Sequence, residues 1–147
     1  MNVVIDASIT LDLFTSIPNS LAHQRATALF DDIAEGRVRA SVPAHYSIEV
    51  ASAVVRFQRR NAGHVTQKTV LQYLEHLQTF AIEHCIFIVN PILVSGWAIA
   101  MNCSGYDAVY IPLARKLDAA LASSDKAQLA AARNFKIALW EPVVRDL

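Results

Sequence analysis

The sequence predicts an α/β domain built on a parallel sheet that helices cover on both faces. Short apolar segments alternate along the chain with longer segments that carry apolar residues at helical spacing, and this alternation is typical of βα units. Hydrophobic residues make up 54% of the 147 residues and charged residues 18%, which suits a sheet buried on both faces. The length fits one domain, and no repeat, linker or low-complexity segment divides it. We therefore expect a single domain over residues 1–147.

The first predicted strand is short and ends in a carboxylate. Val3, Val4 and Ile5 form an apolar run with high strand propensity, and Asp6 follows directly. In open parallel sheets, ligands bind at the edge formed by the carboxyl ends of the strands. We therefore expect the first strand to bring Asp6 to that edge. Four further strands are expected at residues 37–42, 85–89, 119–123 and 137–140, and the continuous apolar run at 85–89 is expected to be fully buried.

Apolar residues at helical spacing predict the helices between these strands. The clearest case is residues 44–60, where Tyr46, Val50 and Val54 form one apolar stripe. Pro112 falls inside the helix predicted after Asp107, where an interior proline requires a kink. The other helices are expected at residues 21–35, 66–80, 90–101, 104–117 and 125–134, and a short apolar segment occupies 9–14.

Charge and motif content exclude several classes of protein. Thirteen basic residues balance thirteen acidic ones, which argues against a protein that coats nucleic acid by charge alone. Dinucleotide-binding, phosphate-loop and serine-hydrolase motifs do not occur. There is no apolar run long enough to span a bilayer and no signal peptide, so we expect a cytoplasmic protein. Cys85 and Cys103 lack metal-ligand spacing and are expected to be buried and reduced, and the five histidines are expected at the surface.

Four acidic residues interrupt or adjoin apolar sequence. Asp6 and Asp125 follow predicted strands and therefore share one edge of the sheet, while Glu49 and Asp107 lie near the beginnings of flanking helices. Four converging carboxylates repel one another unless a divalent cation neutralises them, and oxygen ligands select Mg²⁺ or Mn²⁺ over Zn²⁺. Such an ion can activate water for attack on a phosphodiester. Each residue also has an ordinary explanation, as a helix cap or first-turn acid or, for Glu49, as a surface partner of Arg56.

The four acidic residues lie in four short motifs: residues 4–8 (VIDAS), 47–53 (SIEVASA), 106–110 (YDAVY) and 123–125 (SSD). This ordered set, spread over residues 3–140, resembles the PIN domain, specifically the VapC-type toxins of toxin–antitoxin pairs. The resemblance implies a PIN-like three-layer α/β/α domain with a central five-stranded parallel sheet. It also implies a Mg²⁺-dependent endoribonuclease, usually a homodimer, that an antitoxin inhibits by placing its tail in the acidic site.

Carried over residue by residue, the resemblance makes Asp6, Glu49, Asp107 and Asp125 the catalytic and metal-binding quartet. Asp6 and Asp107 are the first candidates for direct metal ligands. Ser8 and Ser124 match positions that often carry a hydroxyl, which could hold a carboxylate or a water. No further acidic residue follows Asp125 closely, which argues against a second metal ion.

Two other functions stay open. A non-catalytic PIN-like module that binds protein or RNA would keep the four acidic residues as helix caps. A stand-alone RNA-processing nuclease would keep the acidic site and have no antitoxin. The basic end of the helix at 44–60, with Arg56, Arg59 and Arg60, could contact RNA phosphates or could simply be solvated.

Overall fold

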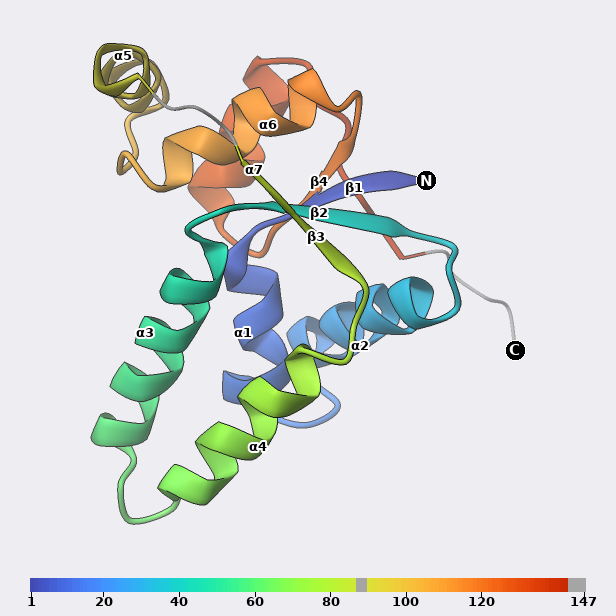
Figure 1. The fold of residues 1–147 in the computed structure, drawn as a ribbon, viewed down its shortest axis with the longest axis vertical. Coiled ribbons are helices and arrows are strands. Elements are labelled where there is room, and N and C mark those ends of the chain that lie inside the picture. The colour runs from blue at the N-terminus through green and yellow to red at the C-terminus, as the bar shows by residue number, and fades with distance from the viewer. Residues whose placement is uncertain (87–89, 143–147) are drawn as a thin grey trace.

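The computed structural model describes residues 1–86 and 90–142 and has a four-stranded parallel sheet between two layers of helices (Figure 1). The strands are β1 (Asn2–Ile5), β2 (Arg39–Pro43), β3 (Ile82–Cys85) and β4 (Ala120–Ala122). They are arranged in the order β3-β2-β1-β4, and all neighbouring strands are parallel. The predicted α/β class with a parallel sheet is therefore confirmed.

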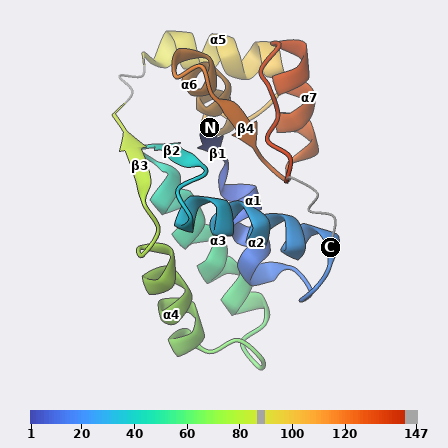
Figure 2. The same cartoon turned by 90° about the vertical axis from the view of Figure 1, so that its right-hand side faces the viewer.

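Two helical layers cover the sheet, one formed by the first four α-helices and the other by the last three α-helices and a 3₁₀ helix (Figures 1 and 2). The first layer contains α1 (Ala7–Thr15), α2 (Leu21–Ala34), α3 (Tyr46–Arg60) and α4 (Gln67–Leu77). The second contains α5 (Pro91–Met101), the 3₁₀ helix η1 (Asp107–Val109), α6 (Tyr110–Lys116) and α7 (Lys126–Asn134). The helices expected from the sequence are present with small shifts at their ends, except that the one expected at 104–117 is divided into η1 and α6.

Strand β1 lies in the middle of the sheet and contributes to the core on both faces. Val3 and Ile5 pack in the cluster on the side of α1–α4, whereas Val4 packs with Tyr110 and Leu121 on the opposite side. This alternation follows from the two-residue period of a strand. These three side chains have no exposed surface, so β1 fixes the position of the residue that follows it.

The prediction of a fifth strand at residues 137–140 is wrong. This segment runs beside β4 but forms only one bridge, between Leu121 and Leu139. Leu121 accounts for both backbone hydrogen bonds, donating to Ala138 O (2.8 Å) and accepting from Trp140 N (2.9 Å). Strand β4 forms three pairs with β1 on its other side, but residues 137–140 meet it at this one position. The side chain of Trp140 anchors the segment instead, since it is buried in the core.

The strand predicted at residues 85–89 lies earlier in the chain, and it is not buried. Strand β3 ends at Cys85, Ile86 is 89% exposed, and residues 87–89 lie outside the described residues. Its last pair joins Cys85 to Pro43, the final residue of β2, so the ladder ends where its partner strand ends. Strand β3 is an edge strand, which is why its side chains are only partly covered.

Pro112 does not interrupt a helix as the sequence suggested. The chain forms the short helix η1 and then begins α6 at Tyr110, so Pro112 lies in the first turn of α6. An N–H group in a first turn has no partner inside its own helix, so proline is tolerated there. Asp107 therefore begins a separate 3₁₀ turn.

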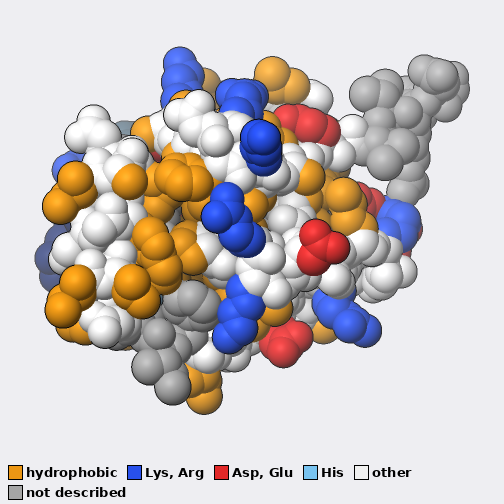
Figure 3. Space-filling model, turned by 90° about the horizontal axis from the view of Figure 1, so that it is seen from above, with side chains coloured by type: hydrophobic (Ala, Val, Ile, Leu, Met, Phe, Trp, Pro, Cys, Tyr) orange, Lys and Arg blue, Asp and Glu red, His pale blue; other side chains and the backbone are white. Residues whose placement is uncertain are grey.

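Several smaller expectations can be compared with the structure. Cys85 and Cys103 are free thiols, and both are half-buried rather than buried. Within the described ranges, no helix combines the length and the apolar character needed to cross a membrane. Seen from the side of the second helical layer, apolar side chains gather at the end of the molecule where α5 lies (Figure 3).

Candidate active site

Asp6 lies at the carboxyl end of β1, as the sequence predicts, and its side chain is almost completely buried. Its backbone N–H donates to Ala122 O (2.9 Å), which ties it to the end of β4. Its carboxylate oxygen Oδ2 accepts hydrogen bonds from Ser8 Oγ (2.5 Å) and Ser123 Oγ (2.7 Å). Although Asp6 occupies the N-cap position of α1, its side chain makes no capping hydrogen bond there. The helix-cap explanation therefore does not account for this carboxylate.

The surroundings of Asp6 disfavour its charged form. Burial raises its pKa from the ordinary 3.8 to about 6, and the Ser8 and Ser123 hydroxyls only partly oppose this shift. The negative charges of Asp107 and Glu49 raise the pKa of Asp6 further. Three of the four carboxylates singled out from the sequence therefore interact electrostatically at one end of the sheet.

Glu49 lies in the first turn of α3 and is held from the second helical layer. Its Oε2 accepts a hydrogen bond from Tyr110 Oη (2.5 Å), and His45 Nε2 lies 3.3 Å from the same oxygen. Burial, followed by the hydrogen bond to Glu49 and the charge of Glu49, raises the pKa of the Tyr110 phenol, so the phenol remains a donor. Among the side chains of the described residues, His45 rather than Arg56 lies within ion-pair distance of Glu49.

Asp107 begins η1, and a local cap holds it. Ser104 Oγ donates to Asp107 Oδ2 (2.6 Å) and accepts from the Asp107 N–H (3.1 Å). The backbone carbonyl of Asp107 accepts from Gln128 Nε2 (2.7 Å), and Gln128 is buried. This last bond fixes η1 against α7.

Asp125 caps α7, as its ordinary explanation suggested. Its Oδ1 accepts from the N–H groups of Ala127 (2.7 Å) and Gln128 (2.9 Å). Its own N–H donates to Ser123 Oγ (3.0 Å), the hydroxyl that also binds Asp6. Asp125 is thus linked to the site through Ser123, and a role in metal binding stays a prediction.

Hydroxyl groups organise this end of the sheet more extensively than the sequence indicated. Ser8 binds Asp6, and Ser124 binds a carboxylate as expected, but its partner is Asp12 of α1 (Oγ to Oδ2, 2.5 Å). Ser8 Oγ also accepts from the Ser124 N–H (2.9 Å). The loop after β4 is therefore fastened to α1. Sequence reasoning missed Ser123, Asp12, Tyr110 and His45, and it had placed His45 at the surface.

The carboxylates have the chemistry of a site for a hard cation but do not form a closed one. Their side-chain hydrogen bonds use one oxygen each: Asp6 Oδ2, Glu49 Oε2, Asp107 Oδ2 and Asp125 Oδ1. Oxygen donors with uncompensated negative charge suit Mg²⁺ or Mn²⁺. In residues 1–86 and 90–142, no three His, Cys, Asp or Glu side chains are grouped closely enough to hold a metal ion. Metal binding would therefore require these side chains to move together.

Comparison with known proteins identifies the fold. No family model and no curated protein matches the sequence. Among solved structures, PAE2754 from Pyrobaculum aerophilum is similar with a TM-score of 0.64 and 20% identity, over 89% of this chain and 79% of that one. FitAcB from Neisseria gonorrhoeae has a TM-score of 0.57 and 16% identity, over 97% and 99%. VapBC-1 from nontypeable Haemophilus influenzae has a TM-score of 0.53 and 14% identity, over 96% and 98%. The PIN-like α/β fold is confirmed, with four strands rather than five.

Proposed function

We propose that this chain is a cytoplasmic, metal-dependent endoribonuclease and the toxin of a toxin–antitoxin pair. The observation that carries the proposal is Asp6, a buried carboxylate with a raised pKa that interacts with the charges of Glu49 and Asp107. Burying a carboxylate beside other carboxylates costs stability, and sites with perturbed pKa values are often functional. The arrangement therefore favours a function that uses negative charge at this edge.

In the proposed mechanism, the protein supplies carboxylates that hydrogen bonds hold near one another at the end of the sheet. Ser8 and Ser123 orient Asp6, Tyr110 orients Glu49, and Ser104 orients Asp107. The second oxygen of Asp6, Glu49 and Asp107 takes no part in these hydrogen bonds, and the three carboxylates would hold Mg²⁺ or Mn²⁺ together with Asp125. When bound, the ion would lower the pKa of a water and stabilise the charge that develops on the phosphate.

The toxin role depends on two kinds of similarity. The four sequence motifs resemble VapC-type toxins, and the fold is similar to structures of VapBC-1 and FitAcB over nearly the whole chain. We therefore propose a separate antitoxin protein as the partner that inhibits the acidic site. A stand-alone nuclease would cleave RNA in the same way but would have no such partner.

We further propose a homodimer, and α5 supports it. The face of α5 toward the domain is half-buried, but its opposite face carries an exposed stripe of Ile92, Leu93, Gly96, Ile99 and Ala100. Ile92 and Ile99 are 80% and 81% exposed, and α5 has no charged residue. A side-chain carbon added at Gly96 would touch nothing within 4 Å, so the stripe is flat at its centre. A second copy can pair with this uncharged stripe about a two-fold axis without charge repulsion.

Two observations favour a non-catalytic module as a second candidate. Asp125 makes the cap expected of an ordinary helix start, and the carboxylates do not form a closed metal site in the described part of the chain. Such a module would bind RNA or protein without cleaving it and would not need Mg²⁺.

Mg²⁺ titration and RNA cleavage by the wild-type protein and Asp6→Asn distinguish the candidates. For the endoribonuclease, labelled RNA of mixed sequence is cleaved with Mg²⁺ and not with EDTA, and Asp6→Asn loses both cleavage and Mg²⁺ affinity. Asp31→Asn is the matched control, because Asp31 is an exposed aspartate on α2. Equal Mg²⁺ affinity and equal cleavage in wild type and Asp6→Asn would reject the proposed function.

A further inference from the structure

A groove between α1 and α3 opens directly beside Glu49. Its volume is about 390 Å³, within the range of small-molecule sites. Ala7 and Leu11 of α1 line one wall, Glu49 and Arg56 of α3 line the other, and Tyr106, which precedes η1, also lines it. The groove therefore begins at the carboxylate cluster and extends away from it along α3.

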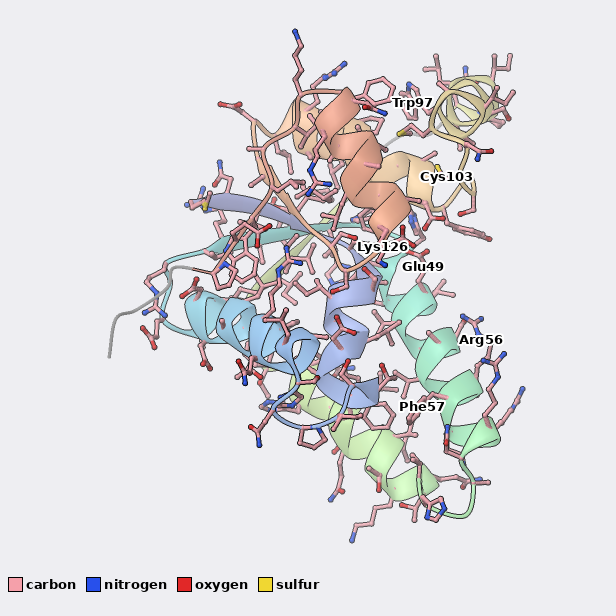
Figure 4. All side chains as sticks on the ribbon, turned by 180° about the vertical axis from the view of Figure 1, so that it is seen from behind. Glu49, Arg56, Phe57, Trp97, Cys103 and Lys126 are labelled. Carbon is pink, nitrogen blue, oxygen red and sulfur yellow. The ribbon has the colours of Figure 1, made fainter. Side chains whose placement is uncertain are left out.

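The α3 wall changes in charge along its length. Ser52 follows Glu49 by three residues and Arg56 follows it by seven, so the three side chains share one face of the helix. The seven-residue separation places Arg56 about 10 Å along the axis from Glu49. Figure 4 shows Glu49 near the sheet end of α3 and Arg56 further along the same helix. A single cation thus lies at the end of the groove far from the carboxylates.

Tyr106 provides an exposed aromatic surface at the groove. It is 64% exposed, although it immediately precedes Asp107. Its ring meets the His45 ring edge-on, with centroids 5.5 Å apart, and His45 packs in the same way on Tyr110 at 5.7 Å. These contacts support the Tyr106 ring from one side and leave much of its surface open to solvent. Exposed aromatic rings beside cations are how proteins bind the bases of single-stranded nucleic acids.

We propose that this groove binds one nucleotide of single-stranded RNA beside the cleavage site, with its base stacked on Tyr106 and a phosphate held by Arg56. This inference rests on the proposed function, because the groove is assigned to RNA through its position beside Glu49 of the proposed cleavage site. An aromatic ring and a cation at separate positions match the two parts of a nucleotide. The chain has no net charge, so this binding depends on local contacts. Duplex RNA keeps its bases stacked inside the helix and cannot present one to Tyr106.

The test measures RNA binding separately from cleavage. The Asp6→Asn protein is the parent, and it receives in turn Tyr106→Ala, Tyr106→Phe and Arg56→Ala. Fluorescence anisotropy then measures the binding of a fluorescein-labelled single-stranded RNA decamer and of a labelled RNA duplex. Tyr106→Ala should weaken binding of the decamer roughly 5- to 150-fold, the range for loss of one stacked base. Tyr106→Phe should bind within about twofold of its parent, because phenylalanine still stacks. Binding of the duplex should not depend on Tyr106.

Salt dependence tests Arg56. Arg56→Ala should reduce the slope of log affinity against log salt concentration by about 0.7, as expected for one lost phosphate contact on a single strand. Arg39→Ala is the matched control and should keep the slope, because exposed Arg39 begins β2 at the opposite end of that strand from α3.

The possible outcomes separate the two proposals. The groove assignment is overturned if the decamer does not bind. It is also overturned if Tyr106→Ala and Arg56→Ala bind the decamer as tightly as their parent does. Either result is expected if a protein segment occupies the groove instead. Equal weakening for decamer and duplex overturns it as well. Binding that depends on Tyr106 and Arg56, in a protein that has Asp6 and does not cleave RNA with Mg²⁺, supports the groove and rejects the endoribonuclease.

Discussion

Replacing Asp6 with asparagine should make the protein more stable at neutral pH while it removes the proposed activity. The carboxylate is buried, and burial together with the charges of Asp107 and Glu49 raises its pKa from 3.8 to about 6. Asparagine has nearly the same shape, and its carbonyl oxygen can accept the hydrogen bonds from Ser8 and Ser123. The substitution therefore removes the charge and keeps the hydrogen bonds.

The sign of the effect follows from proton binding. Between pH 3.8 and pH 6 the folded state holds the proton of Asp6 more tightly than the unfolded state does. The free energy of unfolding therefore falls as pH rises through this interval, and the full penalty remains above about pH 6. A shift of about two pKa units corresponds to roughly 3 kcal/mol. For a chain of this length that is about 6–12 °C in Tm.

The assay is thermal unfolding of wild type, Asp6→Asn and the control Asp31→Asn from pH 4 to pH 8, in EDTA. Asp6→Asn should melt above wild type at pH 8, and the difference should shrink toward pH 4 as Asp6 becomes protonated in wild type. Adding Mg²⁺ should raise the Tm of wild type and leave that of Asp6→Asn unchanged. A difference that stays constant over this pH range, or a variant less stable than wild type at pH 8, would refute the reasoning.

Three more predictions concern neighbouring features. Tyr110→Phe removes the hydrogen bond to Glu49, which should cost about 1.5–3 kcal/mol in chemical denaturation and raise the Mg²⁺ concentration needed for cleavage; an unchanged Mg²⁺ requirement would remove Tyr110 from the site. Asp125→Ser keeps a residue able to cap α7, whereas Asp125→Ala should lose about 1 kcal/mol of stability; if the carboxylate serves only as a cap, Asp125→Ser should cleave RNA as wild type does. Ile99→Glu places a charge in the exposed stripe of α5 and should convert the dimer to a folded monomer in light scattering, while Leu71→Glu, at an exposed position on α4, should remain dimeric. A dimer that survives Ile99→Glu would exclude α5 as its interface.

The sequence was sufficient for features that depend on local pattern. The Val3–Ile5 run predicted a buried strand that delivers Asp6 to the sheet edge, and Asp6 lies there. The same reasoning failed at residues 137–140, because an apolar run does not reveal over how many residues it will pair with the neighbouring strand. It also misplaced β3, since the pairing with β2, which ends at Pro43, determines where that strand stops.

The contacts that organise the candidate site could not be read from local pattern. Tyr110 and Glu49 are 61 residues apart, and Ser123 and Asp6 are 117 residues apart. Only the fold brings such pairs together, and no spacing rule connects them. The serines that follow β4 carried a usable signal, since hydroxyls directly after a strand lie at the same edge as Asp6.

The contacts made by the segment after β4 have a consequence for the order in which the site forms during protein synthesis. The first strand made, β1, lies between β2 and β4, and Asp6 receives one of its two hydroxyl donors from Ser123. Asp107 is fixed by Gln128, later still in the chain. A growing chain that ends before residue 123 therefore lacks Asp125 and the contacts that Ser123 and Gln128 supply. We therefore expect the acidic cluster to take its final arrangement only after residues 123–128 have joined the fold.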